Sequence, residues 1–355
     1  MHPHMLVVGG SGVTGNGAVA ALQDAGWKVT TLSRAAEPPH ETAHLSADLL
    51  DKASLQQHSD SLAHVTHIFY AAIKPSDDAK TEAQENGLMF KNIIESVIAA
   101  GADLKRVIFL QGGKVYGAHL GVYKTPARED DSRHYPPNLY FEHEDYARTL
   151  ENQGISWTAL RPDIMIGHSL GSAMNMGNLI GLYGTLCKHF GVAMQFPGSA
   201  AAYRVLINFT TASLLGKAVV WAADNDKDGA YNVTNGDVCR WKYLWPKLAE
   251  WFGLDVGEPQ PINLQQRLNQ ASDSEWKALA KQYDLQESDI NRIAQGSFGD
   301  FIFHVENDGI FDVTKARQAG FNEMSLRTDD EIIAHLDNMV KDGLIPNPQA
   351  IVDPK

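Results

Sequence analysis

The sequence predicts an α/β fold: a doubly wound parallel sheet followed by a smaller, mostly helical C-terminal part. Three observations predict it. A short apolar run near the N-terminus ends in a glycine-rich turn and continues as a helical pattern over 13–25. Strand-like and helix-like segments then alternate through the first half, as in parallel sheets with helices on both faces. After Pro162 this alternation stops, and a mostly helical tail begins at Trp241.

The first strand and turn read Met5-Leu-Val-Val-Gly-Gly-Ser-Gly-Val-Thr-Gly15. A strand, a tight turn and a helix N-terminus in this order are typical of a Rossmann-type site, where backbone N–H groups and the helix dipole bind a pyrophosphate. The glycines permit the turn, the approach of phosphate and close helix packing. The alternative is a strand–helix turn that binds no ligand. We expect the dinucleotide to contact Gly9, Ser11, Gly12, Val13, Thr14 and Gly15.

The second strand, 28–34, ends in Ser33 and Arg34, where the adenosine ribose is expected. A site that prefers NAD usually has an acidic residue there, whereas a guanidinium matches a 2′-phosphate in charge and geometry. The expected cofactor is therefore NADPH (NADP+) rather than NADH; the alternative for Arg34 is a solvated cation. After a third strand over 44–47, Asp48 and Leu49 are expected at the adenine edge, unless Asp48 is an ordinary loop residue.

The remaining elements complete two predicted domains. Further strands are expected at 65–72, 104–111, 156–161, 203–208 and 231–234, and further helices at 51–62, 78–100, 139–153 and 210–223. Residues 1–166 and about 203–236 should form the NADP-binding domain. About 167–202 and 237–355 should form the substrate-binding part, because substrate selection usually lies in segments appended to the sheet.

The composition limits the classes of partner. The chain has 355 residues, 44% of them hydrophobic, which is enough for a large core. Its net charge of −13 argues against nucleic acid and anionic membranes, since both are polyanions. The two cysteines, Cys187 and Cys239, lack metal-binding spacing and fit a reducing cytoplasm. No segment approaches the ~20 apolar residues of a membrane span, and no signal peptide precedes the first strand. We expect a cytoplasmic protein.

The usual catalytic pattern of short-chain dehydrogenases is altered here. These enzymes carry a Ser or Thr after the fifth strand and a Tyr-x-x-x-Lys on the next helix. In Leu110-Gln-Gly-Gly-Lys-Val-Tyr-Gly117 the serine position holds Gly112, and Lys114 follows two places later. Downstream, Tyr140 is followed four residues later by Glu144 instead of lysine.

At these residues the sequence resembles the progesterone 5β-reductase/iridoid synthase-like (PRISE) family, atypical extended short-chain dehydrogenases. That family has its lysine in Gly-Gly-Lys-x-Tyr and its tyrosine in Asn-Phe-Tyr-Tyr-x-x-Glu-Asp. The matching segments are Gly112-Gly-Lys-Val-Tyr116 and Asn138-Leu-Tyr-Phe-Glu-His-Glu-Asp145. Further similar segments extend over nearly the whole chain, at 69–71, 161–167, 184–189, 232–238, 241–245, 248–253 and 298–300. The departures, in the shorter loop 118–137 and in 255–297, concern the substrate more than the reaction.

The resemblance implies NADPH-dependent reduction of a C=C bond conjugated to a carbonyl group. Hydride would add to the β-carbon, and negative charge would build up on the carbonyl oxygen as an enolate. Tyr140 is the candidate donor to that oxygen, and Lys114 would lie close by, favouring the phenolate or holding ribose and water. The structural alternatives are a Tyr140 packed in a helix interface and a Lys114 on the surface. Further cofactor contacts are expected from Tyr70, Ala71, Gln111, Pro162 and Ile164.

The substrate is expected to be a small hydrophobic enone or enal. Phe298 matches the aromatic residue of a Phe-x-Asp motif that lines the pocket in the resembling family. Met and aromatic residues at such positions are more often simple core. The candidate apolar wall over the nicotinamide comprises Met165, Met174, Met176, Leu179, Tyr203 and Phe298.

The segment His40-Glu-Thr-Ala-His44 matches the zinc-protease pattern H-E-x-x-H. That pattern binds metal only on a helix, which places both histidines on one face. Here Pro38-Pro39 precede it and the strand before Asp48 follows almost at once, so we expect no metal site.

Other functions stay open. A carbonyl reductase would reduce the C=O group and produce an allylic alcohol. A nucleotide-sugar epimerase or dehydratase of the extended type predicts a Tyr-x-x-x-Lys pair at the catalytic tyrosine and a basic cluster for a diphosphate in the C-terminal part. Tyr140 is not followed by such a lysine, and we find no such cluster. A non-catalytic NADP sensor would bind NADPH without turnover. A homodimer is compatible with related folds.

Overall fold

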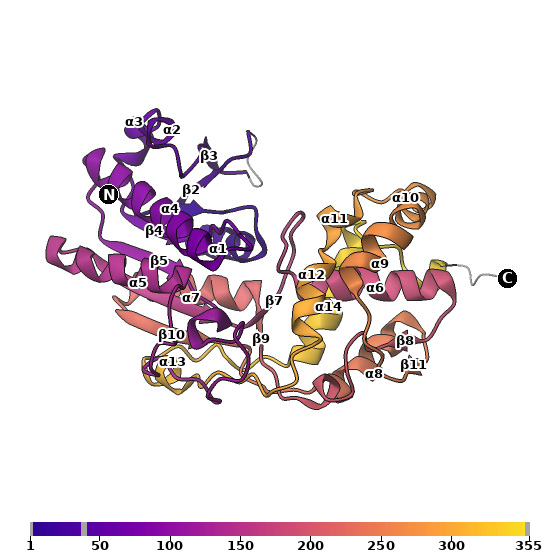
Figure 1. The fold of residues 1–355 in the computed structure, drawn as a ribbon. Helices are drawn as coiled ribbons and strands as arrows, with labels where there is room; N and C mark the ends of the chain where they lie inside the picture. The colour runs from indigo at the N-terminus through magenta and orange to yellow at the C-terminus, as the bar shows by residue number, and fades with distance from the viewer. Residues whose placement is uncertain (1–2, 37–40, 352–355) are drawn as a thin grey trace. The chain divides into compact units, whose positions relative to one another are not determined.

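The computed structural model describes residues 3–36 and 41–351. The chain divides into two compact units, and it passes from one to the other after residues 163, 211, 233, 310 and 324. The first unit contains residues 1–163, 212–233 and 311–324. The second contains residues 164–211, 234–310 and 325–355. Figure 1 labels the elements of both.

The first unit is built on a seven-stranded sheet in which all strand pairs are parallel. In spatial order its strands are β10 (Gly229–Val233), β6 (Ser156–Pro162), β5 (Arg106–Leu110), β4 (His67–Tyr70), β1 (His4–Val8), β2 (Lys28–Ser33) and β3 (Ala43–Ser46). The chain runs from β1 to one edge through β2 and β3, then to the other edge through β4, β5 and β6. This is the predicted doubly wound Rossmann-type fold, whose ligands bind outside the carboxyl ends beside the central strand.

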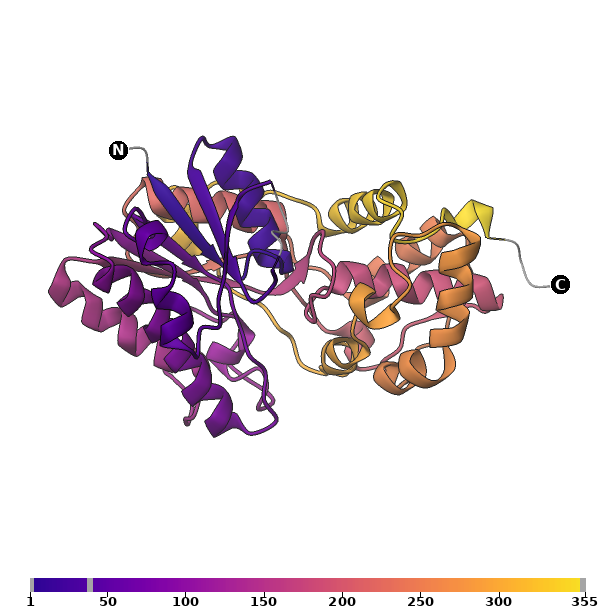
Figure 2. The same cartoon turned by 90° about the horizontal axis from the view of Figure 1, so that it is seen from above.

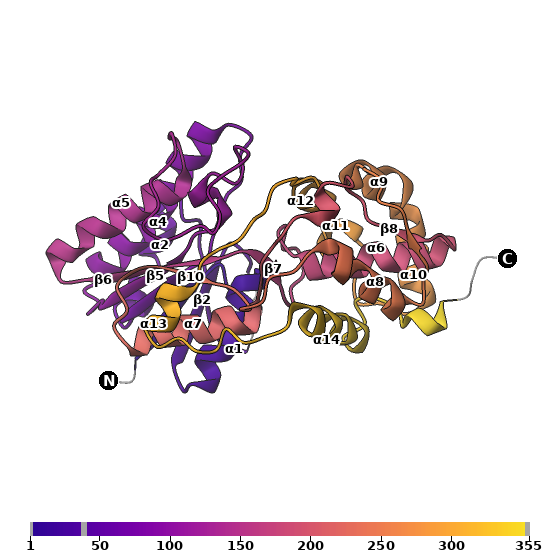
Figure 3. The ribbon, with the colours of Figure 1, turned by 90° about the horizontal axis from the view of Figure 1, so that it is seen from below.

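Helices cover both faces of this sheet. On one face lie α4 (Ala79–Ala99) and α5 (Leu139–Leu150), and on the other lie α1 (Val13–Asp24) and α7 (Ala212–Asp224) (Figure 3). Phe90, Ile93 and Val97 of α4 are completely buried in the core on the first face. The smaller helices of the unit are α2 (Lys52–Gln56), α3 (Ser59–Leu62), η1 (Gly113–Tyr116), η2 (Glu151–Gln153) and α13 (Thr314–Gln318).

The helices α1 and α7 touch through glycines. A Cβ added at Gly17 would lie 2.0 Å from the carbonyl oxygen of Ala212, and one at Gly216 would lie 2.2 Å from that of Gly17. Real Cβ atoms do not approach backbone so closely, so this contact needs glycine on both helices. Backbone therefore packs against backbone behind the glycine-rich turn, which holds α1 against the sheet.

The second unit is mostly helical (Figure 2). Its helices are α6 (Met176–Phe190), η3 (Ala202–Arg204), α8 (Trp241–Phe252), α9 (Leu264–Ala271), α10 (Asp273–Gln282), α11 (Ile290–Ile293), α12 (Gly296–Ile302), α14 (Thr328–Lys341) and η4 (Pro348–Ala350). Its short strands pair as β7 (Ile164–Ile166) with β9 (Phe209–Thr211) and β8 (Met194–Gln195) with β11 (Val256–Gly257). Its core contains Trp241, Trp245 and Phe303, whose rings lie 5.0–6.0 Å apart. The predicted smaller, mostly helical part is therefore present.

Two predicted elements differ from the structure. The predicted helix over 51–62 is divided, because α2 ends at Gln56 and α3 begins at Ser59. The predicted strand over 203–208 is wrong: the 3-10 helix η3 occupies its start, and the strand β9 begins later, at Phe209. The carbonyl of Ser199 accepts a hydrogen bond from the backbone N–H of Tyr203 at 3.0 Å, which turns the chain there.

The division into units differs from the predicted boundaries at four places, and two of these, after residues 163 and 233, lie only three residues before the predicted 166 and 236. Residues 203–211 belong to the second unit, and residues 311–324 return to the first. The return is explained by α13, which packs on β10: Lys315 Nζ donates to the carbonyl oxygen of Ala230 at 2.8 Å and lies over the ring of Tyr231. Such a contact joins sequence-distant segments and leaves no local pattern.

Within the described residues, the structure contains no helix with both the length and the apolar character needed to cross a bilayer.

The contact between α1 and α7 gives a test of the fold. Gly216→Ala should lower the free energy of unfolding by about 1–3 kcal/mol, because the new methyl group overpacks against the Gly17 backbone. Urea unfolding followed by circular dichroism measures this. Lys217→Ala, which removes only an exposed ion pair to Glu323, is the control and should cost less than about 1 kcal/mol. A Gly216→Ala protein as stable as the control contradicts the packing argument.

Candidate active site

The glycine-rich turn joins β1 to α1 at the carboxyl edge of the sheet. Gly9 has φ +87°, and a Cβ there would lie 3.0 Å from the backbone of Ala71 and Ala72. A Cβ at Gly15 would lie 2.2 Å from the carbonyl oxygen of Gly9. Gly9 and Gly15 are therefore required by the turn itself, through a left-handed conformation and close backbone contacts.

Gly12 differs from these two glycines. Its φ is −75°, and the nearest atom to an added Cβ is the Gly9 carbonyl oxygen at 3.6 Å, an ordinary contact. The folded chain therefore has room for a side chain at Gly12. The absence of one leaves the backbone open to a ligand, as a pyrophosphate requires.

The N-terminus of α1 also suits an anion. Gly12 is the N-cap residue and makes no side-chain hydrogen bond to the helix, and no acidic residue lies in the first turn. The partial positive charge of the helix end is therefore not balanced by a carboxylate of the helix itself. The turn and the helix end together fit the pyrophosphate of a nicotinamide dinucleotide.

The end of β2 lies next to this turn, since the Gly9 N–H donates to the Leu32 carbonyl oxygen at 2.9 Å. Ser33 Oγ accepts from the Ala35 N–H at 3.2 Å, and Arg34 is exposed. Within residues 3–36 and 41–351 Arg34 forms no ion pair. Its guanidinium group is therefore accessible to an anion from solvent.

The other predicted cofactor residues lie at strand ends with different exposures. Asp48 is exposed and its Oδ1 accepts from the Leu50 N–H at 2.9 Å, while Leu49 is buried. Ala71 lies against Gly9, whereas the side chain of Tyr70 is buried.

Gln111 and Pro162 are also buried strand-end residues. Gln111 uses its side chain within the protein, accepting from Arg161 Nε at 2.6 Å. Pro162 ends β6, and its carbonyl oxygen would lie 3.9 Å from a Cβ added at Gly112. For Tyr70 and Gln111, contact with a cofactor is thus restricted to backbone atoms.

Lys114 and Tyr140 come from η1 and α5, and the buried side chain of Asn138 joins the two segments. Asn138 caps α5 by accepting at Oδ1 from the Tyr140 N–H at 2.8 Å. Its Nδ2 donates to the carbonyl oxygen of Lys114 at 2.8 Å. A Cβ at Gly112 would lie 3.4 Å from the Tyr140 hydroxyl, so the phenol crosses over the glycine that replaces the usual serine. The lysine and tyrosine segments are therefore brought together.

The Lys114 ammonium has a carboxylate partner that the sequence pattern did not indicate. Lys114 Nζ donates to both oxygens of Glu82, each at 3.0 Å, and Glu82 is buried in the first turn of α4. Tyr140 is half-buried; its burial, with a smaller contribution from the charge of Glu82, raises the pKa of its phenol well above the usual value. Tyr140 is thus a neutral hydrogen-bond donor at neutral pH.

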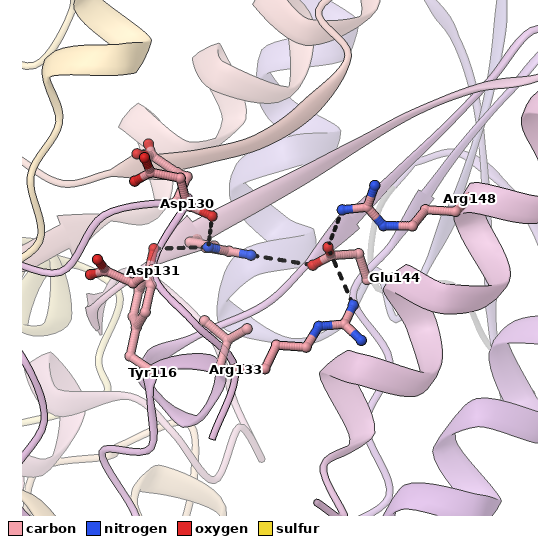
Figure 4. A pocket seen from close by; sticks show the side chains of 9 residues that line it. Tyr116, Asp130, Asp131, Arg133, Glu144 and Arg148 are labelled. Carbon is pink, nitrogen blue, oxygen red and sulfur yellow. Dashed lines mark hydrogen bonds and ion pairs between the residues drawn. The ribbon is translucent and has the colours of Figure 1, made fainter. Parts of the chain in front are cut away.

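Glu144, at the position of the usual lysine, belongs to a separate buried network (Figure 4). Its carboxylate pairs with Arg148 at 2.7 Å, Arg161 at 3.2 Å and Arg133 at 3.3 Å. Arg161 is buried as well and also donates to the hydroxyl of Tyr116 at 3.0 Å. These side chains line a polar cavity of about 220 Å³.

The pKa of Glu144 reflects this environment. Burial alone would raise it, but hydrogen bonds from Arg148 and Gln111 and the charge of Arg161 hold the pKa of the carboxyl below its usual value. A depressed pKa means that this carboxylate contributes stability above its unfolded-state pKa and that the contribution is lost as the pH falls. Glu144 therefore has a structural role.

The predicted substrate residues lie in the second unit. Met174 is exposed, and Tyr203 and Phe298 are half-buried. Met165 of β7 is buried, with 6% exposed, as is its neighbour Ile164, which was predicted as a cofactor contact. Met176 and Leu179 are completely buried in the core of this unit, so the prediction that they line a pocket is wrong.

The H-E-x-x-H segment is only partly described, because His40 lies outside the described residues. His44 lies on β3, with Nδ1 2.8 Å from Thr31 Oγ1 and Nε2 2.9 Å from the Ala35 carbonyl oxygen. Its ring is therefore engaged on both sides within the sheet edge. Across residues 3–36 and 41–351, no three His, Cys, Asp or Glu side chains gather in a way that could hold a metal ion.

Three contributors to this site were not identified from the sequence: Glu82, the bridging role of Asn138 and the arginines around Glu144. Asn138 had a local signal, since an Asn directly before a helical pattern is a favoured N-cap. Glu82 had none, because it meets Lys114 across 32 positions of sequence.

Comparison with known proteins places this geometry in a family. A model of the PRISE-like Rossmann-fold domain matches residues 42–346. An (S)-8-oxocitronellyl enol synthase of Nepeta cataria is 30% identical over 89% of this chain and 86% of its own length. A 3-oxo-Δ(4,5)-steroid 5-β-reductase of Arabidopsis thaliana is 28% identical over 89% of this chain and 86% of its own length.

Among solved structures, a UDP-glucose 4-epimerase of Thermus thermophilus in complex with NAD is similar in fold. The TM-score is 0.64 at 18% identity, and the match covers 98% of this chain and 100% of the epimerase. At that identity the similarity concerns the fold alone.

The network around Glu144 predicts that the usual motif cannot be restored by one substitution. Glu144→Lys recreates Tyr-x-x-x-Lys but places a fourth cation among three arginines. We expect it to lower the free energy of unfolding by about 3–5 kcal/mol, as when a buried pair is broken. Thermal unfolding measures this, with Asp145→Asn, at the exposed neighbouring position, as the control. A Glu144→Lys protein of unaltered stability contradicts the structural role.

Proposed function

Because the chain belongs to the PRISE-like Rossmann-fold family, we propose that it is an NADPH-dependent reductase of enones or enals. The proposed reaction reduces the C=C bond conjugated to the carbonyl group. Family membership makes the chain an oxidoreductase, and the names of its relatives, an enol synthase and a Δ(4,5)-steroid 5-β-reductase, support this type of substrate. The single observation that carries the proposal is the neutral, half-buried phenol of Tyr140 held beside the Lys114 segment.

The first unit would bind the cofactor. The glycine turn and the N-terminus of α1 would hold the pyrophosphate, and Arg34 the 2′-phosphate. When bound, the reduced nicotinamide supplies the hydride for the β-carbon, and one proton completes the saturated product. Backbone atoms at the ends of β4, β5 and β6 would line the rest of this site.

Tyr140 would stabilise the oxygen of the enolate. As hydride reaches the β-carbon, negative charge moves onto the carbonyl oxygen, so a donor already aimed at that oxygen lowers the barrier. The Tyr140 phenol can serve as this donor because its raised pKa keeps it protonated. Asn138 fixes the start of α5 and thereby the direction of the ring.

The second unit would recognise the substrate. Its candidate residues are Met165, Met174, Tyr203 and Phe298, whose side chains are apolar or aromatic and suit a small hydrophobic enone or enal. The two polar partners that the reaction needs, Tyr140 and Lys114, both belong to the first unit. Reaction type and substrate range would therefore be set by different segments.

The reaction itself is the first test. With 2-cyclohexen-1-one the protein should oxidise NADPH and form cyclohexanone. Tyr140→Phe should lower turnover by about 10²–10³-fold, as removal of an oxyanion donor does, with little change in NADPH affinity. Product analysis and steady-state kinetics measure both effects. Tyr135→Phe, at a tyrosine that is 88% exposed, is the matched control.

The outcome separates the candidate functions. Allylic alcohol as the only product would reject conjugate reduction in favour of a carbonyl reductase. NADPH binding without turnover of any enone or carbonyl compound would instead favour the sensor. Unchanged turnover in Tyr140→Phe would remove Tyr140 from the mechanism.

Cofactor choice is tested at Arg34. Arg34→Ala should weaken NADPH binding by about tenfold or more, because a charge-assisted hydrogen bond to the 2′-phosphate is worth about 1.5–3 kcal/mol. NADH lacks that phosphate, so its binding should not change and serves as the internal control. Titration of both cofactors by fluorescence gives the two dissociation constants. Equal losses for NADPH and NADH would disprove the assignment.

A further inference from the structure

Glu82 and Lys114 form a two-point contact, and Asn138 joins the Lys114 segment to the start of the helix that carries Tyr140. Lys114 Nζ lies 3.0 Å from each carboxylate oxygen of Glu82. The Glu82 side chain is 11% exposed and the Lys114 side chain 37%, so the pair is only partly screened by water. The negative charge of Glu82 therefore balances the positive charge of Lys114, and the predicted catalytic pattern does not contain this carboxylate.

Of the charged groups around the Tyr140 phenol, Glu82 contributes to the raised pKa. Glu144, one helical turn away, is already paired with three arginines. His143, on the same helix as Tyr140, has a ring centroid 6.3 Å away and, through burial, a pKa of about 4, so it is neutral in alkaline solution. His119 faces Lys114 and also has a lowered pKa, because of burial and the lysine charge. His134 Nε2 lies 3.0 Å from the Lys114 carbonyl oxygen.

We propose that Glu82 is a positioning residue that holds the Lys114 ammonium and balances its charge, so that Tyr140 meets the substrate as a neutral phenol. This inference rests on the proposed function, because it concerns the charge state of the same active site. It concerns a residue that neither motif contains.

The charge balance matters because a tyrosine that acts as a base and a tyrosine that acts as a hydrogen-bond donor need opposite protonation states. A nearby ammonium with no partner stabilises the phenolate and so turns a tyrosine into a base. Conjugate reduction needs the reverse, a phenol that gives a hydrogen bond or a proton to an enolate. A carboxylate that balances the lysine keeps Lys114 close while removing its pull on the phenol proton. Glu82 also repels the phenolate directly.

Glu82→Gln tests this directly. The substitution removes the negative charge but keeps a polar side chain of the same length, so Lys114 acts on Tyr140 without balance. Tyr140 should then ionise at a pH lower by about one unit or more, the scale of shift that a neighbouring charge produces. The signal of Tyr140, identified by its loss in Tyr140→Phe, is followed by NMR of ring-labelled tyrosine through a pH titration.

Two variants serve as controls. Glu82→Asp keeps the charge in the first turn of α4 and should restore ionisation near the pH of the unaltered protein. Glu85→Gln breaks another glutamate–lysine pair of the same helix, to Lys74 at 2.9 Å, and should leave the Tyr140 titration unchanged. Because Glu82→Gln and Glu85→Gln each lose one carboxylate, a general effect on α4 would appear equally in both.

The NMR titration needs no turnover, so it remains readable even if enone reduction fails. If the protein reduces enones, the alkaline limit of its activity should fall in Glu82→Gln by the same shift as the phenol ionisation. The proposal is overturned if Tyr140 in Glu82→Gln ionises at the same pH as in the unaltered protein, or does not ionise before the variant unfolds.

Discussion

The candidate site depends on one side-chain amide. Asn138 accepts from the Tyr140 N–H and donates to the Lys114 carbonyl, so it binds a helix end and a 3-10 helix at once. Asn138 is 5% exposed, and buried polar groups that lose their partners are costly. Separation of α5 from η1 would break the hydrogen bond from the buried Asn138 amide to the Lys114 carbonyl oxygen. The relation between the phenol and the lysine segment is therefore fixed by backbone contacts, which survive changes in the two side chains.

The second constraint is the buried carboxylate of Glu144. Three guanidinium groups contact it, and one of them, Arg161, is buried and also holds Gln111 and Tyr116 at the carboxyl edge of the sheet. A lysine at this position would lie against the same three guanidinium groups, so another segment has to supply the site with an ammonium group. η1 is that segment, because Asn138 already ties it to α5. The altered motif thus follows from the packing of the sheet edge.

The sequence predicted the parts of this molecule that have local signatures. The strand over 28–34 and the glycine turn could be predicted because a short strand-like run and a fixed glycine spacing are properties of neighbouring residues. The observed β2 ends at Ser33, one residue before the predicted end. The break between α2 and α3, the turn at η3 and the return of α13 to β10 depend on contacts between distant segments. In the site, Tyr140 and Lys114 could be located from their motifs. Glu82 could not, because nothing in its surroundings within α4 marks it as a partner of Lys114.

These constraints bear on how such a site can change. In the usual arrangement tyrosine and lysine share one helix face, so their distance is set by a single turn of helix. Here they lie on separate segments, and each depends on a further residue: Tyr140 on Asn138 for its position, and Lys114 on Glu82 for its charge balance. Moving the lysine back to position 144 would require removal of three arginines and release of Glu82 as well. No single step in that series leaves all buried charges paired. Because each buried charge needs its partner, these ion pairs oppose a return to the usual Tyr-x-x-x-Lys motif, whatever substrate the second unit selects.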